Sequence, residues 1–406
     1  MLFWVYLFSS VLCLTFGVDF AEIKARKGKG LNIMNCTQEA RYALKARFVN
    51  SPFAGDGSIC SSLSFFFAAL FRADHDPADK LMVTVGANKG YDVVNFLSLW
   101  GTQDSNVLTF SNWAKLLSKM HNQGREVDDW TCGVCKECQE KIRVQPEYLP
   151  ERSAPVAPSP EKKRRRRDGG SFTHTHLVLP FVIALDSNPR NTHSLRRIQT
   201  SYSLSLMPLT AVVTNATDPE ELLVPSCAWG DEDCAQSSNN SNINTANVDQ
   251  PEPDFPVRQL TLSSLIHELQ VNGTLSTRKD ISILRIRANG REPLVMLGAK
   301  ELFRSGRIRL IIFSYSPSLW PGDEALHEYI DMLSSPLTMN APHGGACYLL
   351  GNTRTWKLTG GCWDGIYHKH PANIACVKAG DPWETALDGI AVRHRRIAMP
   401  YSRGSG

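Results

Sequence analysis

Apolar stretches alternate along the chain with amphipathic segments, and this alternation predicts the order of strands and helices. The clearest case is residues 81–100, where the apolar run Leu81–Val85 precedes the turn Gly86–Gly90 and a segment with apolar residues at helical spacing. This pattern predicts a strand, a glycine turn and a helix, which form the opening unit of a nucleotide-binding α/β domain. Glycines let the backbone come close to a ligand, and the start of a helix offers N–H groups to it.

The same alternation continues on both sides of this unit. We expect strands at 177–186, 209–214, 280–287 and 309–315, and helices at 38–48, 61–71, 190–198, 262–271 and 293–303. Repeated alternation of strands and helices predicts an α/β fold with a mainly parallel sheet and helices on both of its faces.

Three regions depart from this pattern. Residues 2–18 are apolar and uncharged, so 1–21 is expected to be a signal peptide or an uncleaved membrane anchor, with a helical segment over 22–80. An insertion covers about 101–176, and its proline-rich part at about 146–171 predicts disorder. The basic run Lys162–Arg167 within it is either a protease cleavage site or a solvated loop, and an N-terminal signal argues against a nuclear address. Residues 316–406 are expected to form a C-terminal extension of short strands that contains cysteines.

Composition narrows the class of protein. The 406 residues are 42% hydrophobic and 21% charged, which is typical of a globular protein, and the net charge of +4 gives no reason to expect a nucleic-acid partner. Four glycosylation triplets fit the predicted signal and indicate the secretory pathway, whether lumenal, membrane-anchored or secreted; they begin at Asn35, Asn215, Asn239 and Asn272. Removal of the signal would leave ten of the eleven cysteines, an even number that disulfides could use.

The cysteines leave two alternatives open. Cys132, Cys135 and Cys138 could supply three ligands to zinc, but a structural site needs four, and in an oxidising lumen disulfides are the favoured use. We therefore predict no metal site. Cys347, Cys362 and Cys376 either pair among themselves or pack as small hydrophobic residues.

In a parallel sheet, ligands bind at the carboxyl ends of the strands. Asp186 ends the second core strand, where an acid can accept hydrogen bonds from both hydroxyls of a ribose. Such an acid usually lies about 20 residues after the glycine turn, and the predicted insertion explains the longer spacing here. The candidate cofactor-binding residues are Gly86, Ala87, Asn88, Gly90 and Asp186.

Four segments in this order resemble motifs of the FkbM family of S-adenosylmethionine-dependent methyltransferases. The segment 83–90 resembles Asp-x-Gly-Ala-Asn-x-Gly, 182–191 resembles a motif with an acid before Asn-Pro, and 211–215 resembles Ala-Val-Ser-Asn. The segment 283–299 resembles the signature that begins hydrophobic-Lys-x-Asp-x-Glu-Gly and ends Val-Leu-x-Gly-Ala. The resemblance covers 81–315 and implies the class I methyltransferase fold, with seven strands of which the last is antiparallel. It also implies S-adenosylmethionine as the cofactor at the candidate residues.

Some acids of the family motifs are replaced. Thr84 stands at the first acid, and Arg285, Arg287 and Asn289 stand at the Lys, Asp and Glu of the last signature, whereas Gly290 and the later Glu292 keep the family character. The resemblance implies O-methylation of a hydroxylated small molecule or glycan. The replaced acids leave a second hypothesis open, in which a catalytically inactive methyltransferase fold serves as a binding or scaffold module. No catalytic residue is assigned.

Overall fold

The computed structural model describes residues 37–49, 63–77, 79–101, 108–109, 112–113, 116–117, 180–216, 221–224, 255–277, 279–320, 325–336, 344–351, 353–359 and 363–392. The segment 1–21, the linker 146–171 with its basic run, the three cysteines at 132–138 and Cys362 lie outside these residues, as does most of the insertion.

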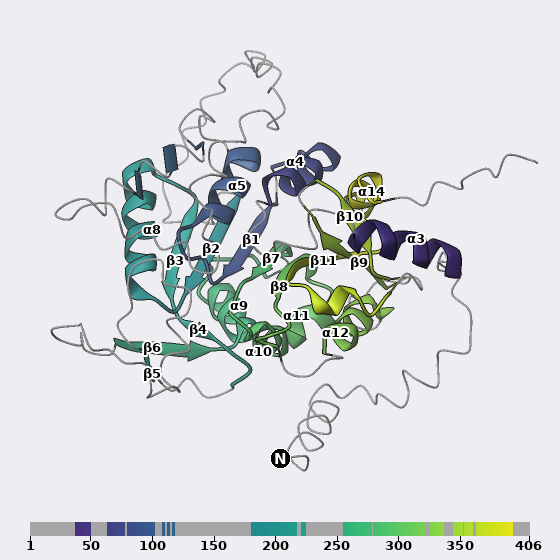
Figure 1. The fold of residues 1–406 in the computed structure, drawn as a ribbon. Helices are drawn as coiled ribbons and strands as arrows, with labels where there is room; N and C mark the ends of the chain where they lie inside the picture. Colours follow the sequence, from purple (N-terminus) through teal and green to yellow (C-terminus); the bar gives the residue numbers. More distant parts are fainter. Residues whose placement is uncertain are drawn as a thin grey trace, which may run out of the picture.

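An eight-stranded sheet forms the centre of the protein (Figure 1). Its strands lie side by side in the order β10 (Thr355–Lys357), β9 (Gly345–Leu350), β11 (Ala372–Lys378), β8 (Ile308–Tyr315), β7 (Ile281–Ile286), β1 (Leu81–Val85), β2 (Phe181–Asp186) and β3 (Leu206–Thr210). The five strands from β8 to β3 run parallel to one another. Strand β11 is antiparallel to both β8 and β9, and β10 is antiparallel to β9. The predicted α/β class with a mainly parallel sheet is confirmed.

Helices cover both faces of the sheet, as predicted (Figure 1). One face packs against α4 (Ser64–Ala73), α5 (Tyr91–Trp100), α8 (Pro189–Tyr202) and α14 (Pro382–Gly389). The other packs against α3 (Gln38–Val49), α9 (Leu262–Val271), α10 (Glu292–Gly298), α11 (Lys300–Arg304) and α12 (Ala325–Ser334). Because side chains alternate across a strand, Met82 contributes to the first core, and Leu81 and Val83 to the second. None of the helices within the described ranges is long and apolar enough to cross a membrane.

The C-terminal part of the chain is built into the main sheet. Strands β9, β10 and β11 all come from the segment 316–406, and a disulfide joins Cys347 of β9 to Cys376 of β11. These two cysteines are directly opposite each other in the β9–β11 register, and both are buried. Of the two alternatives for these cysteines, pairing is therefore the one observed. The short helix η6 (Tyr367–Lys369) precedes β11.

Two predicted elements are divided in the structure. The strand predicted at 209–214 is interrupted at Ala211: β3 ends at Thr210, and β4 (Val212–Val213) joins a second, small sheet with β6 (Phe255–Leu260) and β5 (Glu221–Val224). The single helix predicted at 293–303 is two helices, α10 and α11. Gly298 at their junction lies so close to β4 that an added Cβ would be 2.1 Å from the carbonyl oxygen of Thr214.

A charged cluster connects the N-terminal helices to the C-terminal one at the amino ends of the strands. Arg309 of β8 donates to Asp74 after α4 and to Asp381 before α14, and its guanidinium carbon is 4.3 Å from the ring centroid of Trp383. Lys80 also donates to Asp74, at 2.9 Å. Burial raises the pKa of the Asp74 carboxyl. Hydrogen bonds and charges from Lys80 and Arg309 lower it by more than burial raises it, so the pKa lies below its ordinary value.

Candidate functional site

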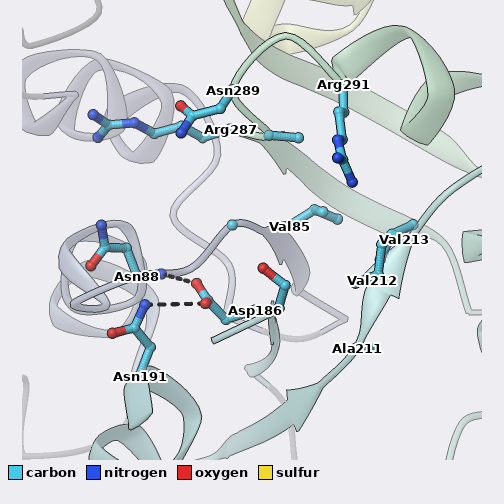
Figure 2. Close-up of a pocket in the computed structure, with 13 residues that line it drawn as sticks. Val85, Asn88, Asp186, Asn191, Ala211, Val212, Val213, Arg287, Asn289 and Arg291 are labelled. Atoms are coloured by element: carbon cyan, nitrogen blue, oxygen red, sulfur yellow. Dashed lines mark hydrogen bonds between the residues drawn. The ribbon is translucent and has the colours of Figure 1, made fainter. Parts of the chain in front are cut away.

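A cleft opens at the carboxyl ends of β1, β2, β3 and β7, where ligands bind in parallel sheets (Figure 2). The space inside it is about 90 Å³, and about 710 Å³ lies between the lining atoms when the part open to solvent is included. Its lining residues are Val85, Gly86, Asn88, Asp186, Ser187, Asn191, Ala211, Val212, Val213, Arg287, Ala288, Asn289 and Arg291.

Asp186 links the glycine turn to the start of α8. Its Oδ2 accepts a hydrogen bond from the backbone N–H of Asn88 at 2.6 Å. Its Oδ1 accepts bonds from the backbone N–H of Asn188 at 2.9 Å and from Nδ2 of Asn191 at 3.1 Å. Pro189 at the first turn of α8 and the side chain of Asn188, which accepts from the N–H of Arg190, start the helix at this point. One carboxylate therefore fixes two of the segments that line the cleft, and Figure 2 shows it between them.

Gly86 permits the close approach of two strands. It has a φ of +75°, and a Cβ there would lie 1.8 Å from the carbonyl oxygen of Arg287. Its N–H and that of Ala87 both donate to the carbonyl of Leu185. The requirement for glycine at this position thus follows from the backbone of the chain itself.

Gly90 has a different environment. It also has a φ of +75° and caps α5, and a Cβ there would lie 2.6 Å from Leu195 and 2.9 Å from Trp113. The indole of Trp113 donates to the carbonyl of Lys89 at 2.7 Å. Among the predicted cofactor residues, Gly86, Asn88 and Asp186 line the cleft, whereas Gly90 and the buried Ala87 do not.

The opposite side of the cleft is the loop 287–291 between β7 and α10. Glu292 holds this loop: its Oε1 accepts from the N–H of Ala288 and its Oε2 from that of Gly290, both at 2.8 Å. The indole of Trp320 donates to Oε2 at 3.0 Å. Burial raises the pKa of the Glu292 carboxyl, and these donors oppose that shift. Glu292 therefore holds the loop in place through hydrogen bonds to its backbone.

The cationic residue Arg285 is buried in the middle of the sheet. Its guanidinium donates to Asp92 at 3.2 Å, to the hydroxyl of Ser314 at 3.1 Å and to the amide oxygen of Asn373 at 3.0 Å. Burial lowers its pKa, and Asp92 opposes this shift. Thr84 lies beside Arg285 in the register of β1 and β7 and is 1% exposed, so it does not reach the cleft.

The sequence analysis identified only some of the residues that line this cleft. Ser187, Asn191 and Ala211–Val213 line the cleft because they follow the ends of β2 and β3, and they fall in or beside motifs that the sequence analysis identified. Arg291 was missed, although it follows Gly290 directly. Its position one residue after a glycine turn at the end of a strand is a sequence signal that could have identified it.

No family model matches this chain, and neither a curated protein nor a solved structure shows significant similarity to it. Within the described ranges there is also no group of three or more His, Cys, Asp or Glu residues arranged to hold a metal ion.

Proposed function

We propose that this cleft binds S-adenosylmethionine and that the protein transfers its methyl group to an oxygen of a hydroxylated acceptor, such as a glycan, in the secretory pathway. The observation that carries the proposal is the position of Asp186. Its carboxylate ends β2, binds the backbone of the glycine turn that follows β1, and lines the cleft beside the apolar segment Ala211–Val213. The chain uses three of the roughly four acceptor positions of this carboxylate, so one ribose hydroxyl would donate to it, and the apolar segment would contact the adenine.

The sheet gives independent support. Without the short edge strand β10, seven strands remain, and the last of them in the sequence, β11, is antiparallel to both of its neighbours. This agrees with the seven strands and antiparallel last strand that the resemblance to the FkbM family implies.

When bound, the cofactor supplies a methyl group on a positively charged sulfur. Transfer of this group to a hydroxyl would form an oxygen–carbon bond, break the sulfur–carbon bond so that S-adenosylhomocysteine leaves, and pass the hydroxyl proton to water. Such an in-line displacement needs the two reactants held in line, so the main task of the chain is positioning. The fixed glycine turn and the loop 287–291, on opposite sides of the cleft, provide rigid backbone for that task.

One observation favours the second hypothesis, a binding module without catalysis. Within the described part of the chain, the ionisable side chains that line the cleft are Asp186, Arg287 and Arg291. Asp186 already accepts three hydrogen bonds from the chain, and arginine stays protonated, so neither is suited to take a proton from the acceptor.

Calorimetry on the full chain tests cofactor binding, with S-adenosylmethionine and S-adenosylhomocysteine as ligands. Micromolar binding is expected, and it should be lost in Ser187→Trp, which places a large ring in the cleft. The control is the same substitution at the exposed Ser305. If folded wild-type protein binds neither ligand, the methyltransferase is refuted and the binding or scaffold module remains. If it binds both, formation of S-adenosylhomocysteine in the presence of simple glycans separates an enzyme from a binding module.

A further inference from the structure

Two of the four glycosylation triplets begin at residues that the structure describes. Asn272 closes α9, and Asn215 follows the small strand β4. An N-linked glycan requires the sequence Asn-x-Ser or Asn-x-Thr, and because the glycan is bulky and polar, the folded chain must leave the asparagine on its surface. Both asparagines are exposed, so their local geometry and their positions in the fold must distinguish them.

The triplet Asn272–Thr274 forms a turn at the end of α9. The N–H of Asn272 still donates to the carbonyl of Glu268 in the helix, at 2.9 Å. Gly273 then has a φ of +71°, a conformation that ends many helices and that glycine adopts without strain. Leu275, directly after the triplet, is buried in the core. The backbone of the turn is therefore held on both sides, while the side chain of Asn272 stays exposed.

The surroundings of the two asparagines differ. The amide of Asn215 is already engaged, because its oxygen accepts a hydrogen bond from the hydroxyl of Thr214 at 3.2 Å. Beside Asn272, the side chain of Val271 is 71% exposed, the largest fraction for a large hydrophobic side chain in the described ranges. The carbon–hydrogen face of a sugar on Asn272 can cover this valine, and removal of apolar surface from water is favourable.

Asn272 also lies at the end of the sheet opposite the cleft. A Cβ added to Gly298 would lie 3.5 Å from the nitrogen of Leu262, where α9 begins, and 2.1 Å from the carbonyl oxygen of Thr214, which follows the cleft lining. In its last turn α9 accepts a hydrogen bond at 3.4 Å from Arg307, directly before β8. The helix spans about 15 Å between these points. A glycan at its end therefore stays clear of the cleft, whereas one at the other triplet would stand beside it.

We infer that Asn272 is a modification site and carries an N-linked glycan. In this reaction the side-chain amide nitrogen forms a bond to C1 of an N-acetylglucosamine, and the amide loses one proton to water. The bond between C1 and a phosphate oxygen of a lipid-linked diphosphate donor breaks, and the diphosphate leaves with the electron pair. The transferring enzyme and its donor belong to the secretory pathway, so the inference rests on that part of the proposed function and not on its methyltransferase part.

Mass spectrometry of the full chain, expressed in eukaryotic cells, tests this assignment directly. Trypsin releases residues 259–278 as one peptide, and Asn272 is the only asparagine in it. We expect this peptide to carry a glycan of N-acetylhexosamine and hexose units, with the bare peptide as a minor fraction. Intact glycopeptides are measured because an Asn-Gly pair also deamidates, which would imitate the enzymatic removal of a glycan.

Variants of the triplet test the motif without changing the asparagine. Thr274→Ala should lose the glycan from this peptide, whereas Thr274→Ser should keep it. Thr277→Ala, at an exposed position three residues later, is the matched control and should keep the glycan as well. After partial digestion with a glycosidase, Asn272→Gln should give one band fewer than the wild type on a gel.

A bare peptide 259–278 from folded wild-type protein overturns the inference, as does a glycan that persists in Thr274→Ala. If other triplets of the same protein carry glycans, the chain has entered the lumen and the assignment to Asn272 is wrong. If none does, the secretory part of the proposed function fails with the inference. The methyltransferase part is tested separately by calorimetry: a glycan on Asn272 without cofactor binding supports the modification site alone, and cofactor binding without this glycan refutes the modification site alone.

Discussion

Replacement of Asp186 by asparagine tests whether one carboxylate holds the cleft together. The substitution keeps the shape of the side chain but gives it only one oxygen. Asp186 accepts hydrogen bonds from three donors: the backbone N–H groups of Asn88 and Asn188 and the side-chain amide of Asn191. An asparagine can therefore satisfy one side only, and its own N–H groups will face a donor on the other.

The magnitude follows from these contacts. In the better orientation the amide oxygen keeps the two bonds of Oδ1, and the N–H of Asn88 loses its acceptor at 2.6 Å. Leaving a buried donor unpaired costs about 1–3 kcal/mol, and the two retained bonds weaken because their acceptor is no longer charged. The amide costs less to bury than the carboxylate, which offsets part of the loss. We expect a net loss of about 2–3 kcal/mol in the free energy of unfolding, equivalent to a fall in Tm of about 4–12 °C for a domain of this size.

Urea and thermal unfolding of the full chain measure this effect. Asp331→Asn on α12 removes a charge from a half-exposed carboxyl and should change the stability by less than about 0.5 kcal/mol. If the Tm of Asp186→Asn lies within about 2 °C of that of the wild type, which corresponds to less than about 1 kcal/mol, the carboxylate does not fix the glycine turn. The argument that it organises the cleft is then wrong.

Three further predictions each compare two proteins that differ in one defined contact. Within the described residues the hydroxyl of Thr84 is buried without a hydrogen-bond partner, whereas that of Thr355 donates to a backbone carbonyl at 2.9 Å. In urea titrations Thr84→Val should therefore raise the free energy of unfolding and Thr355→Val should lower it, each by about 1 kcal/mol. If both substitutions changed the free energy of unfolding in the same direction, this reasoning would be wrong. Gly86→Ala should cost more than about 3 kcal/mol or prevent folding, while Gly389→Ala at the end of α14, with nothing within 4 Å, should stabilise by up to about 1 kcal/mol. Because neighbouring cations hold the pKa of Asp74 below 3.8, the stability it contributes is present above that pH and is lost as the pH falls through the lower folded pKa. Unfolding measured from pH 7 downwards should thus show wild type and Asp74→Asn converging only below about pH 4, and a constant difference would refute the ion pair.

The sequence predicted the sheet well because the strands are buried on both faces. Runs such as Leu81–Val85 and Ile308–Tyr315 are almost continuously apolar, and only a strand between two helical layers requires this. The division at Ala211 could not be predicted in the same way. The segment 209–214 contains no glycine or proline that would mark a break, and its last residues leave the main sheet to pair with β6, a partner far along the chain.

Long-range contacts also explain what the sequence could not give for the site. Asp186 was identified because an acid at a strand end has a recognisable pattern. Its three hydrogen bonds depend on where β1 and α8 meet, and no pattern along the chain states this. The position of Arg291 directly after Gly290 marks it as a candidate, but the direction of its side chain towards Val213 follows only from the fold (Figure 2).

The glycine turn shows how a motif and its usual meaning can be separated. Gly86 is required by the carbonyl of Arg287, and Gly90 by Leu195 and Trp113, so both glycines would be needed here even without a ligand. The turn by itself is therefore weak evidence for a cofactor. The stronger evidence is the combination around it, in which Asp186 faces a fixed wall with two arginines across a cleft. Loss of ligand binding in Ser187→Trp would thus be more informative about function than loss of the glycines, which would disrupt the fold in either case.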